Sequence, residues 1–114
     1  MGIDYYAYMT YGVKHDLDGK FADIYLESGA DHEKLPVVFD DLYGTMHIGV
    51  VLFETESITD NGETKKNMVV NPDDVSGLMR MRKKYESEFG DLFPEHKNLL
   101  DGEWRIRSFV RMCV

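Results

Sequence analysis

Residues 45–55 form a segment that is apolar on both of its alternating faces. The apolar side chains fall on one face as Met46, Ile48, Val50 and Leu52, and on the other as Val51 and Phe53. A strand that is apolar on both faces is covered on both faces, which is typical of a central position in a sheet. We therefore expect this segment to be a central strand.

The first quarter of the chain predicts a β-hairpin. Residues 3–14 are rich in tyrosine and in β-branched or apolar side chains, which favour a strand. Residues 16–19, Asp-Leu-Asp-Gly, predict a turn, and residues 20–27 predict the second strand. We expect the register that places His15 opposite Lys20, because a shift by one residue would mix the two faces.

That register separates the hairpin side chains by type. The apolar face pairs Val13 with Ala22, Tyr11 with Ile24, and Met9 with Leu26. The opposite face carries aromatic and charged side chains: Tyr6, Tyr8, Thr10, Lys14, Phe21, Asp23, Tyr25 and Glu27. If a helix covers the apolar face, the aromatic and charged face is exposed.

The middle of the chain predicts shorter elements. Residues 35–39 predict a short strand, followed by a turn over residues 40–44. The Asn-Gly pair within residues 60–63 is a strong hairpin signal. It leads into a strand expected over residues 65–70.

The last third predicts the main helix and the final strand. The helix begins at Asn71-Pro72-Asp73-Asp74, a capping residue followed by proline and two acids, and is expected to end at Gly90. Its apolar stripe consists of Val75, Leu78, Met81, Tyr85 and Phe89. Residues 94–100 predict a short helix, and residues 103–113 predict a strand.

These elements, in the order β-β-(β)-β-β-α-β, predict an α+β fold. We expect a single domain over residues 1–114, with an antiparallel sheet of about five strands and one main helix packed on one face. A single cysteine, Cys113, argues against a disulfide framework, and no apolar run approaches the length of a membrane helix. We expect a cytoplasmic protein that contacts no membrane.

Charge is unevenly distributed along the chain. Residues 1–60 hold twelve acids and three bases, whereas residues 61–114 hold nine acids and ten bases. An excess of acid opposes binding to nucleic acid, which relies on lysine and arginine to neutralise phosphates. It favours a basic protein surface as partner, or serves solubility alone.

No motif identifies a reaction. Asp16, Asp18 and Glu27 match three positions of a calcium loop, but Phe21 stands where that loop requires glycine. The four histidines have no ligand spacing, no serine lies in a nucleophile elbow, and the glycines form no phosphate loop. We therefore assign no catalytic residue, no metal site and no cofactor.

The leading hypothesis is a non-catalytic protein that binds through the acidic, tyrosine-bearing face of the hairpin. The expected contact residues are Asp4, Tyr6, Tyr8, Phe21, Asp23, Tyr25 and Glu27. The expected partner is basic, such as a nuclease or a nucleic-acid-binding protein. By composition alone, the chain is analogous to small acidic inhibitors of the immunity or phage anti-defence type. A homodimer that covers this face is an open alternative.

A second hypothesis places a small anionic ligand, or an enzymatic reaction, elsewhere. Arg105, Arg107 and Arg111 alternate along the last predicted strand and therefore share one face. His47 lies on the central strand. The alternative site combines this arginine row with His47.

Overall fold

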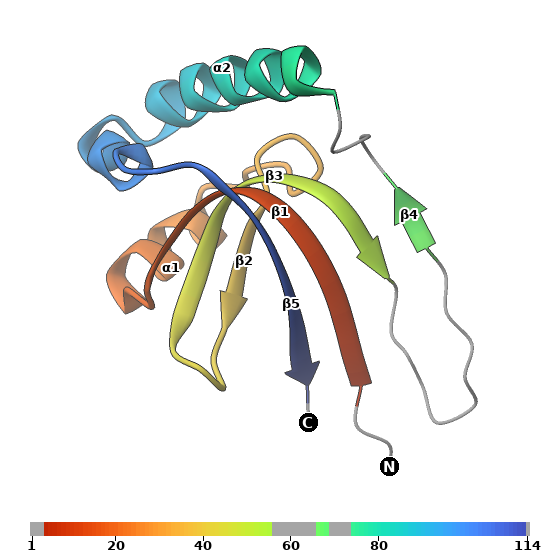
Figure 1. The fold of residues 1–114 in the computed structure, drawn as a ribbon. Coiled ribbons are helices and arrows are strands. Elements are labelled where there is room, and N and C mark those ends of the chain that lie inside the picture. The colour runs from red at the N-terminus through yellow and green to blue at the C-terminus, as the bar shows by residue number, and fades with distance from the viewer. Residues whose placement is uncertain (1–3, 56–65, 69–73, 114) are drawn as a thin grey trace.

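The computed structural model describes residues 4–55, 66–68 and 74–113. The elements follow in the order β1 (Asp4–Asp16), α1 (Gly19–Glu27), β2 (Val37–Asp40), β3 (Thr45–Thr55), β4 (Lys66–Met68), α2 (Val75–Leu92), the 3-10 helix η1 (Pro94–Leu100) and β5 (Arg105–Cys113). A curled sheet lies beneath the long helix α2, with α1 at one side (Figure 1).

All strand pairs are antiparallel, and the strand order is β2-β3-β1-β5. The predicted α+β class with an antiparallel sheet is confirmed. The expected number of about five strands is slightly higher than the four on this continuous path. The short strand β4 pairs with β3 outside that path, at Phe53–Thr55.

The prediction that residues 45–55 form a central strand is confirmed. Strand β3 pairs with β1 on one edge, and with β2 and β4 on the other. Its Met46, Ile48 and Leu52 side chains are almost completely buried. The apolar composition of this strand therefore reflects its position in the middle of the sheet.

The predicted second hairpin strand is wrong, because residues 20–27 lie in helix α1. Asp18 caps this helix, and its carboxylate accepts hydrogen bonds from the backbone N–H groups of Lys20 and Phe21. Phe21 and Tyr25, one helical turn apart, enter the core with 0% and 1% of their surface exposed. The expected register between His15 and Lys20 therefore does not exist.

Strand β1 pairs instead with two strands that are distant in sequence. On one edge it pairs with β3, and on the other with β5, from Asp4 opposite Cys113 to Gly12 opposite Arg105. Both edges of β1 are therefore taken over Tyr8–Gly12, which leaves no free edge there for residues 20–27.

The other predicted elements are mostly confirmed. Strand β2 lies within two residues of the expected range, β4 lies inside the expected range 65–70, and η1 and β5 form where predicted. The Asn-Gly hairpin signal at 60–63 falls outside the described residues, as do Asn71 and Pro72.

Helix α2 is capped by Asp74, which accepts a hydrogen bond from the Gly77 N–H, and it continues past the expected stop at Gly90 to Leu92. Of the predicted stripe, Leu78, Tyr85 and Phe89 are buried, whereas Val75 is 67% exposed. The core-facing stripe of the helix therefore starts one turn later than the sequence suggested.

An aromatic cluster joins the helices to the convex face of the sheet. The ring of Phe21 lies 5.9 Å from that of Phe89 and 5.5 Å from that of Phe93. Such separations are typical of favourable aromatic pairs. Helix α1 is therefore part of the same core as α2.

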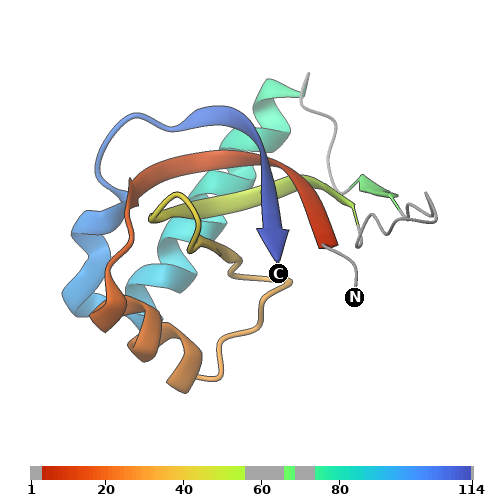
Figure 2. The same cartoon turned by 90° about the horizontal axis from the view of Figure 1, so that it is seen from below.

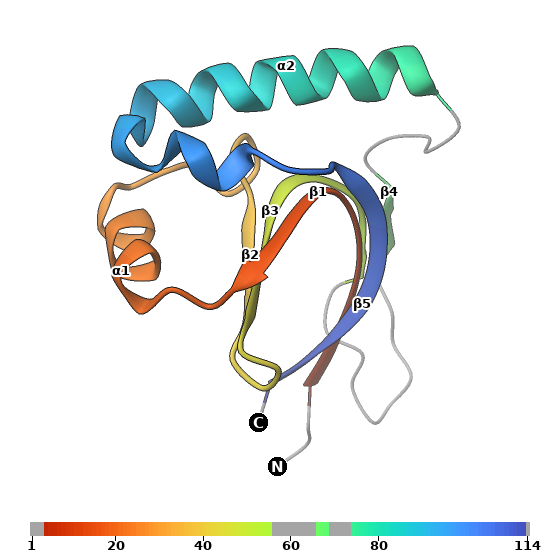
Figure 3. The same cartoon turned by 60° about the vertical axis from the view of Figure 1, so that its left-hand side comes forward.

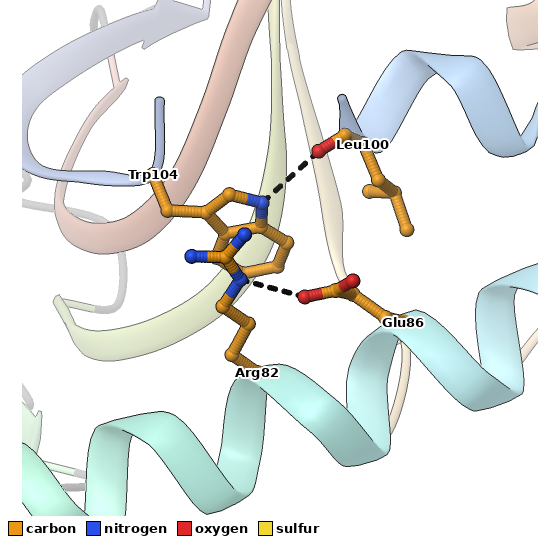
Figure 4. Close-up of polar contacts among 4 residues, drawn as sticks. All are labelled: Arg82, Glu86, Leu100 and Trp104. Atoms are coloured by element: carbon orange, nitrogen blue, oxygen red, sulfur yellow. Dashed lines mark hydrogen bonds and ion pairs between the residues drawn. The ribbon is translucent and has the colours of Figure 1, made fainter. Parts of the chain in front are cut away.

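Trp104, just before β5, connects β5 to α2 and η1 (Figure 4). Its indole N–H donates a hydrogen bond of 3.1 Å to the carbonyl of Leu100. The guanidinium of Arg82 lies 4.9 Å from the centre of the Trp104 ring and pairs with Glu86 at 2.6 Å. One side chain thus fixes the entry of β5 against two helices.

The sheet bends sharply where two glycines face each other. Gly12 of β1 pairs with Gly49 of β3, and the register between these strands shifts between Met9 and Thr10. A Cβ atom on either glycine would meet the backbone of the opposite strand. The bend curls the sheet (Figure 3) and brings the rings of His47 and Phe109 to 3.7 Å.

Candidate functional site

The structure separates the residues of the predicted partner-binding face. Phe21 and Tyr25 are buried, so the expectation that they are exposed beside the other tyrosines is wrong. Tyr6 and Tyr8 lie on β1, where they pair with Arg111 and Phe109 of β5. The remaining members of the set lie on two elements: Asp4 at the start of β1, and Asp23 and Glu27 exposed on α1.

The predicted arginine row lies on one face of β5, but its members have different surroundings. Arg105 forms a surface ion pair with Glu103 at 2.5 Å. Arg107 donates a hydrogen bond of 2.7 Å to the backbone carbonyl of Gly12. Arg111 lines a cavity. The three guanidiniums therefore do not converge on a common site.

His47, the other residue of that hypothesis, lies inside the curled sheet. It is 6% exposed, and its ring stacks on that of Phe109. Its Nδ1 is buried and has no hydrogen-bond partner among the described residues. Burial lowers the pKa of His47 to about 4, helped by the charges of Lys14 and Arg107 and opposed by Asp40. His47 is therefore a neutral, packed side chain at neutral pH.

We expect this histidine to make folding sensitive to acid. The pKa of His47 is about 4 in the folded chain and 6.5 in the reference state. The stability that depends on a neutral His47 is therefore complete above pH 6.5 and is lost as the pH falls toward 4. One such group changes the free energy of unfolding by at most about 1.4 kcal/mol per pH unit. Urea unfolding at several pH values between 7 and 4 gives the pH dependence of the free energy of unfolding for the parent and for His47→Gln. If the free energy of unfolding fell equally with pH in both proteins, His47 would not be the acid-sensitive group.

A cavity of about 780 Å³ lies between the sheet, the helices and the connection that follows α1. Its walls come from every layer of the fold: Tyr8 of β1, Leu26 of α1, residues 32–34 and Pro36 of the α1–β2 connection, residues 37–39 of β2, Val50, Val51 and Glu54 of β3, Met81, Lys84 and Tyr85 of α2, and Arg111 of β5. Figure 2 shows the α1–β2 connection on the open side of the curled sheet. Small-molecule pockets commonly have volumes of roughly 300–1,000 Å³.

Two tyrosines hold the connection that forms one wall of the cavity. The Tyr25 hydroxyl donates a hydrogen bond of 2.7 Å to the Leu35 carbonyl, and the Tyr85 hydroxyl donates one of 2.7 Å to the Pro36 carbonyl. Burial raises the pKa of Tyr25 to about 12 and that of Tyr85 well above 10. Both hydroxyls therefore remain protonated donors at neutral pH, and the wall is fixed from α1 and from α2.

The polar groups of the cavity are mixed, with cations in the majority. Lys34, Lys84 and Arg111 contribute positive charge, against Glu33 and Glu54. Burial raises the pKa of Tyr8, and the nearby guanidinium of Arg111 opposes that rise. Arg111 and Glu54 both act on the Tyr8 phenol, with opposite effects on its pKa, and all three side chains line the cavity.

Two of the lining residues belong to the predicted site sets: Arg111 to the arginine row of the anionic-ligand hypothesis, and Tyr8 to the partner-binding face. Tyr85 was predicted only as part of the apolar stripe of the helix. That interpretation was local, whereas the cavity is assembled from six separate elements and the α1–β2 connection. No spacing within the sequence could have indicated it.

Among the described residues, no group of three or more histidine, cysteine or acidic side chains is arranged to hold a metal ion. Neither described α-helix is both long and apolar enough to span a membrane. Comparison with protein-family models, with curated proteins and with solved structures finds no match to the chain.

Proposed function

We propose that the protein binds a small amphipathic anion in the cavity beneath α2. The observation that carries this proposal is the position of Arg111 and Lys84, from β5 and α2, on the walls of one cavity of about 780 Å³. An arginine beside a tyrosine hydroxyl offers several donors to a carboxylate or phosphate. Lys84 adds a second positive charge from another element.

The rest of the lining defines the other half of the ligand. Most of the remaining wall is apolar or aromatic: Leu26, Pro36, Val37, Val38, Phe39, Val50, Val51 and Met81. A fully hydrated inorganic ion would leave this surface without contacts. An aliphatic or aromatic acid would bury its apolar part there and place its charge at Arg111.

The test is ligand-induced stabilisation across matched acids and their amides. A ligand that binds only the folded chain raises its stability, by about 2.7 kcal/mol at a concentration one hundred times its dissociation constant. We expect aromatic or medium-chain carboxylates to raise the melting temperature, and the corresponding amides to have little effect.

Two matched arginine variants locate the binding. Arg111→Gln should weaken binding by about tenfold or more, because it removes a charge-assisted contact. Arg105→Gln is the control, since Arg105 lies on the same strand but only pairs with Glu103 at the surface. Equal binding by both variants, or no stabilisation by any acid at saturating concentration, would contradict the proposal.

Binding of a basic protein stays a second prediction. It is supported by carboxylates that are exposed on and around α1: Asp16, Asp18, Asp23, Glu27, Asp31 and Glu33. Such a surface would steer a basic partner and make association sensitive to salt. Affinity capture with Asp23→Lys and Glu27→Lys as controls tests it, and equal capture by parent and variants would count against it.

A further inference from the structure

Strand β5 is the terminal strand of the sheet and has a long edge. All of its residues, Arg105–Cys113, pair with β1, and no described strand pairs with its other edge. In an antiparallel ladder, every second residue directs its N–H and C=O groups away from a given neighbour. The outer edge of β5 therefore presents a row of backbone donors and acceptors.

The two faces of β5 differ in chemistry. On the convex face, Ile106 is 46% exposed and Val110 is 51% exposed, with the exposed Ser108 between them. On the concave face lie three arginines and one aromatic ring: Arg105, Arg107, Phe109 and Arg111. A strand added to this edge would place alternate side chains beside these two rows.

The arginine row disfavours a second copy of this chain as the occupant. In the two-fold antiparallel register that pairs the whole of β5 with itself, Phe109 lies opposite its own copy and Arg107 lies opposite the copy's Arg111. Like charges directly opposite each other destabilise a strand pair. Charge complementarity therefore favours an acidic occupant.

We propose that the outer edge of β5 binds an extended acidic segment of a partner protein by strand addition. The acidic residues of the segment alternate with apolar ones, so that acids lie beside Arg105, Arg107 and Arg111 and apolar side chains lie beside Ile106 and Val110. Backbone hydrogen bonds give affinity, and the two side-chain rows give specificity and register. This interaction shares Arg111 with the proposed anion site, whereas Arg105 and Arg107 lie outside that cavity.

The test uses a designed peptide with this pattern. In antiparallel alignment from Arg111 to Arg105, the complementary sequence is Glu-Val-Leu-Thr-Glu-Val-Glu, acetylated, amidated and labelled for fluorescence anisotropy. We expect binding, and at least tenfold weaker binding for a peptide of the same composition with its three acids contiguous. A lysine-for-glutamate version should not bind, because it repeats the like-charge clash.

Main-chain pairing is tested by N-methylation. In an extended peptide, every second backbone amide points to the same side. One version of the peptide is N-methylated on the amides of one side, and a second version on the amides of the other side. One version should bind at least about tenfold more weakly, because its methylated amides face β5, while the other binds within about threefold of the parent. Equal binding by both versions would overturn strand addition.

Variants of the protein separate this edge from the cavity. Arg105 lies outside the cavity lining. Arg105→Glu should therefore weaken peptide binding by about tenfold without changing the binding of small acids. Lys84→Gln is the reverse control and should affect only the acids. Unchanged peptide binding by Arg105→Glu would overturn the proposal, as would sedimentation of the protein as a stable dimer that does not bind the peptide.

Discussion

Gly49→Ala is expected to lower the free energy of unfolding by about 3–5 kcal/mol, a large part of the ~5–15 kcal/mol that a domain has. A Cβ atom at this position would meet the backbone carbonyl of Tyr11 and lie 2.6 Å from the Cα of Gly12. Neither contact belongs to a flexible side chain, so the strands themselves would have to separate. The φ of 153° at Gly49 adds a conformation that alanine rarely adopts.

A matched glycine distinguishes this steric effect from a general effect of added side chains. Gly19 begins α1, and a Cβ atom there would have nothing within 4 Å. Gly19→Ala should therefore leave stability unchanged or raise it by up to about 1 kcal/mol. Urea unfolding of both variants makes the comparison. A Gly49→Ala protein as stable as Gly19→Ala would show that the sheet does not need this close approach.

Trp104→Ala is expected to lower the free energy of unfolding by about 3–5 kcal/mol, as for other buried aromatic side chains. The indole is 7% exposed and packs edge-on against Tyr11 at 5.4 Å and Tyr85 at 6.0 Å. Its removal leaves a cavity between β1, α2 and the start of β5. It also leaves Arg82 without the ring that its guanidinium covers.

Two milder variants divide this loss into its parts. Trp104→Phe keeps an apolar ring but removes the N–H that bonds to Leu100, and should cost about 1–3 kcal/mol. Arg82→Gln removes the cation beside the ring and should cost about 0.5–1 kcal/mol, as at other partly exposed sites. If Trp104→Ala were no more destabilising than Arg82→Gln, the packing role assigned to the indole would be wrong.

Residues 20–27 illustrate where sequence reasoning failed and why. The apolar residues Ala22, Ile24 and Leu26 recur with a period of two, which suits a strand, but Phe21 and Tyr25 are also one helical turn apart. Local periodicity fits both structures. The choice is made by β1, whose two edges are taken by β3 and β5 over Tyr8–Gly12. The cap at Asp18 was present in the sequence, where it had been interpreted as part of a turn.

Elements with stronger local signals were predicted correctly. The alternating pattern of β5 indicates a strand, and the β-branched, apolar composition of β3 favours a buried strand over a helix. The candidate cavity was not predictable in the same way. Its wall at Pro36 depends on the Tyr85 hydroxyl, 49 positions away in the chain. A contact of that kind follows from the assembled core rather than from spacing.

The pairing of β1 with β5 has a consequence for the order of folding. Asp4 lies opposite Cys113, so the first described strand finds one of its two neighbours only at the other end of the chain. During synthesis β1 would stay without that neighbour until the last strand has left the ribosome. Closure between such distant segments slows folding, because chain entropy is lost before the contacts form. Because Asp4 and Cys113 are adjacent, a circular permutant could join β5 to β1 through a short linker and begin instead in the Asp41–Gly44 turn. In that permutant the pairing of β1 with β5 would be local in sequence and would form early.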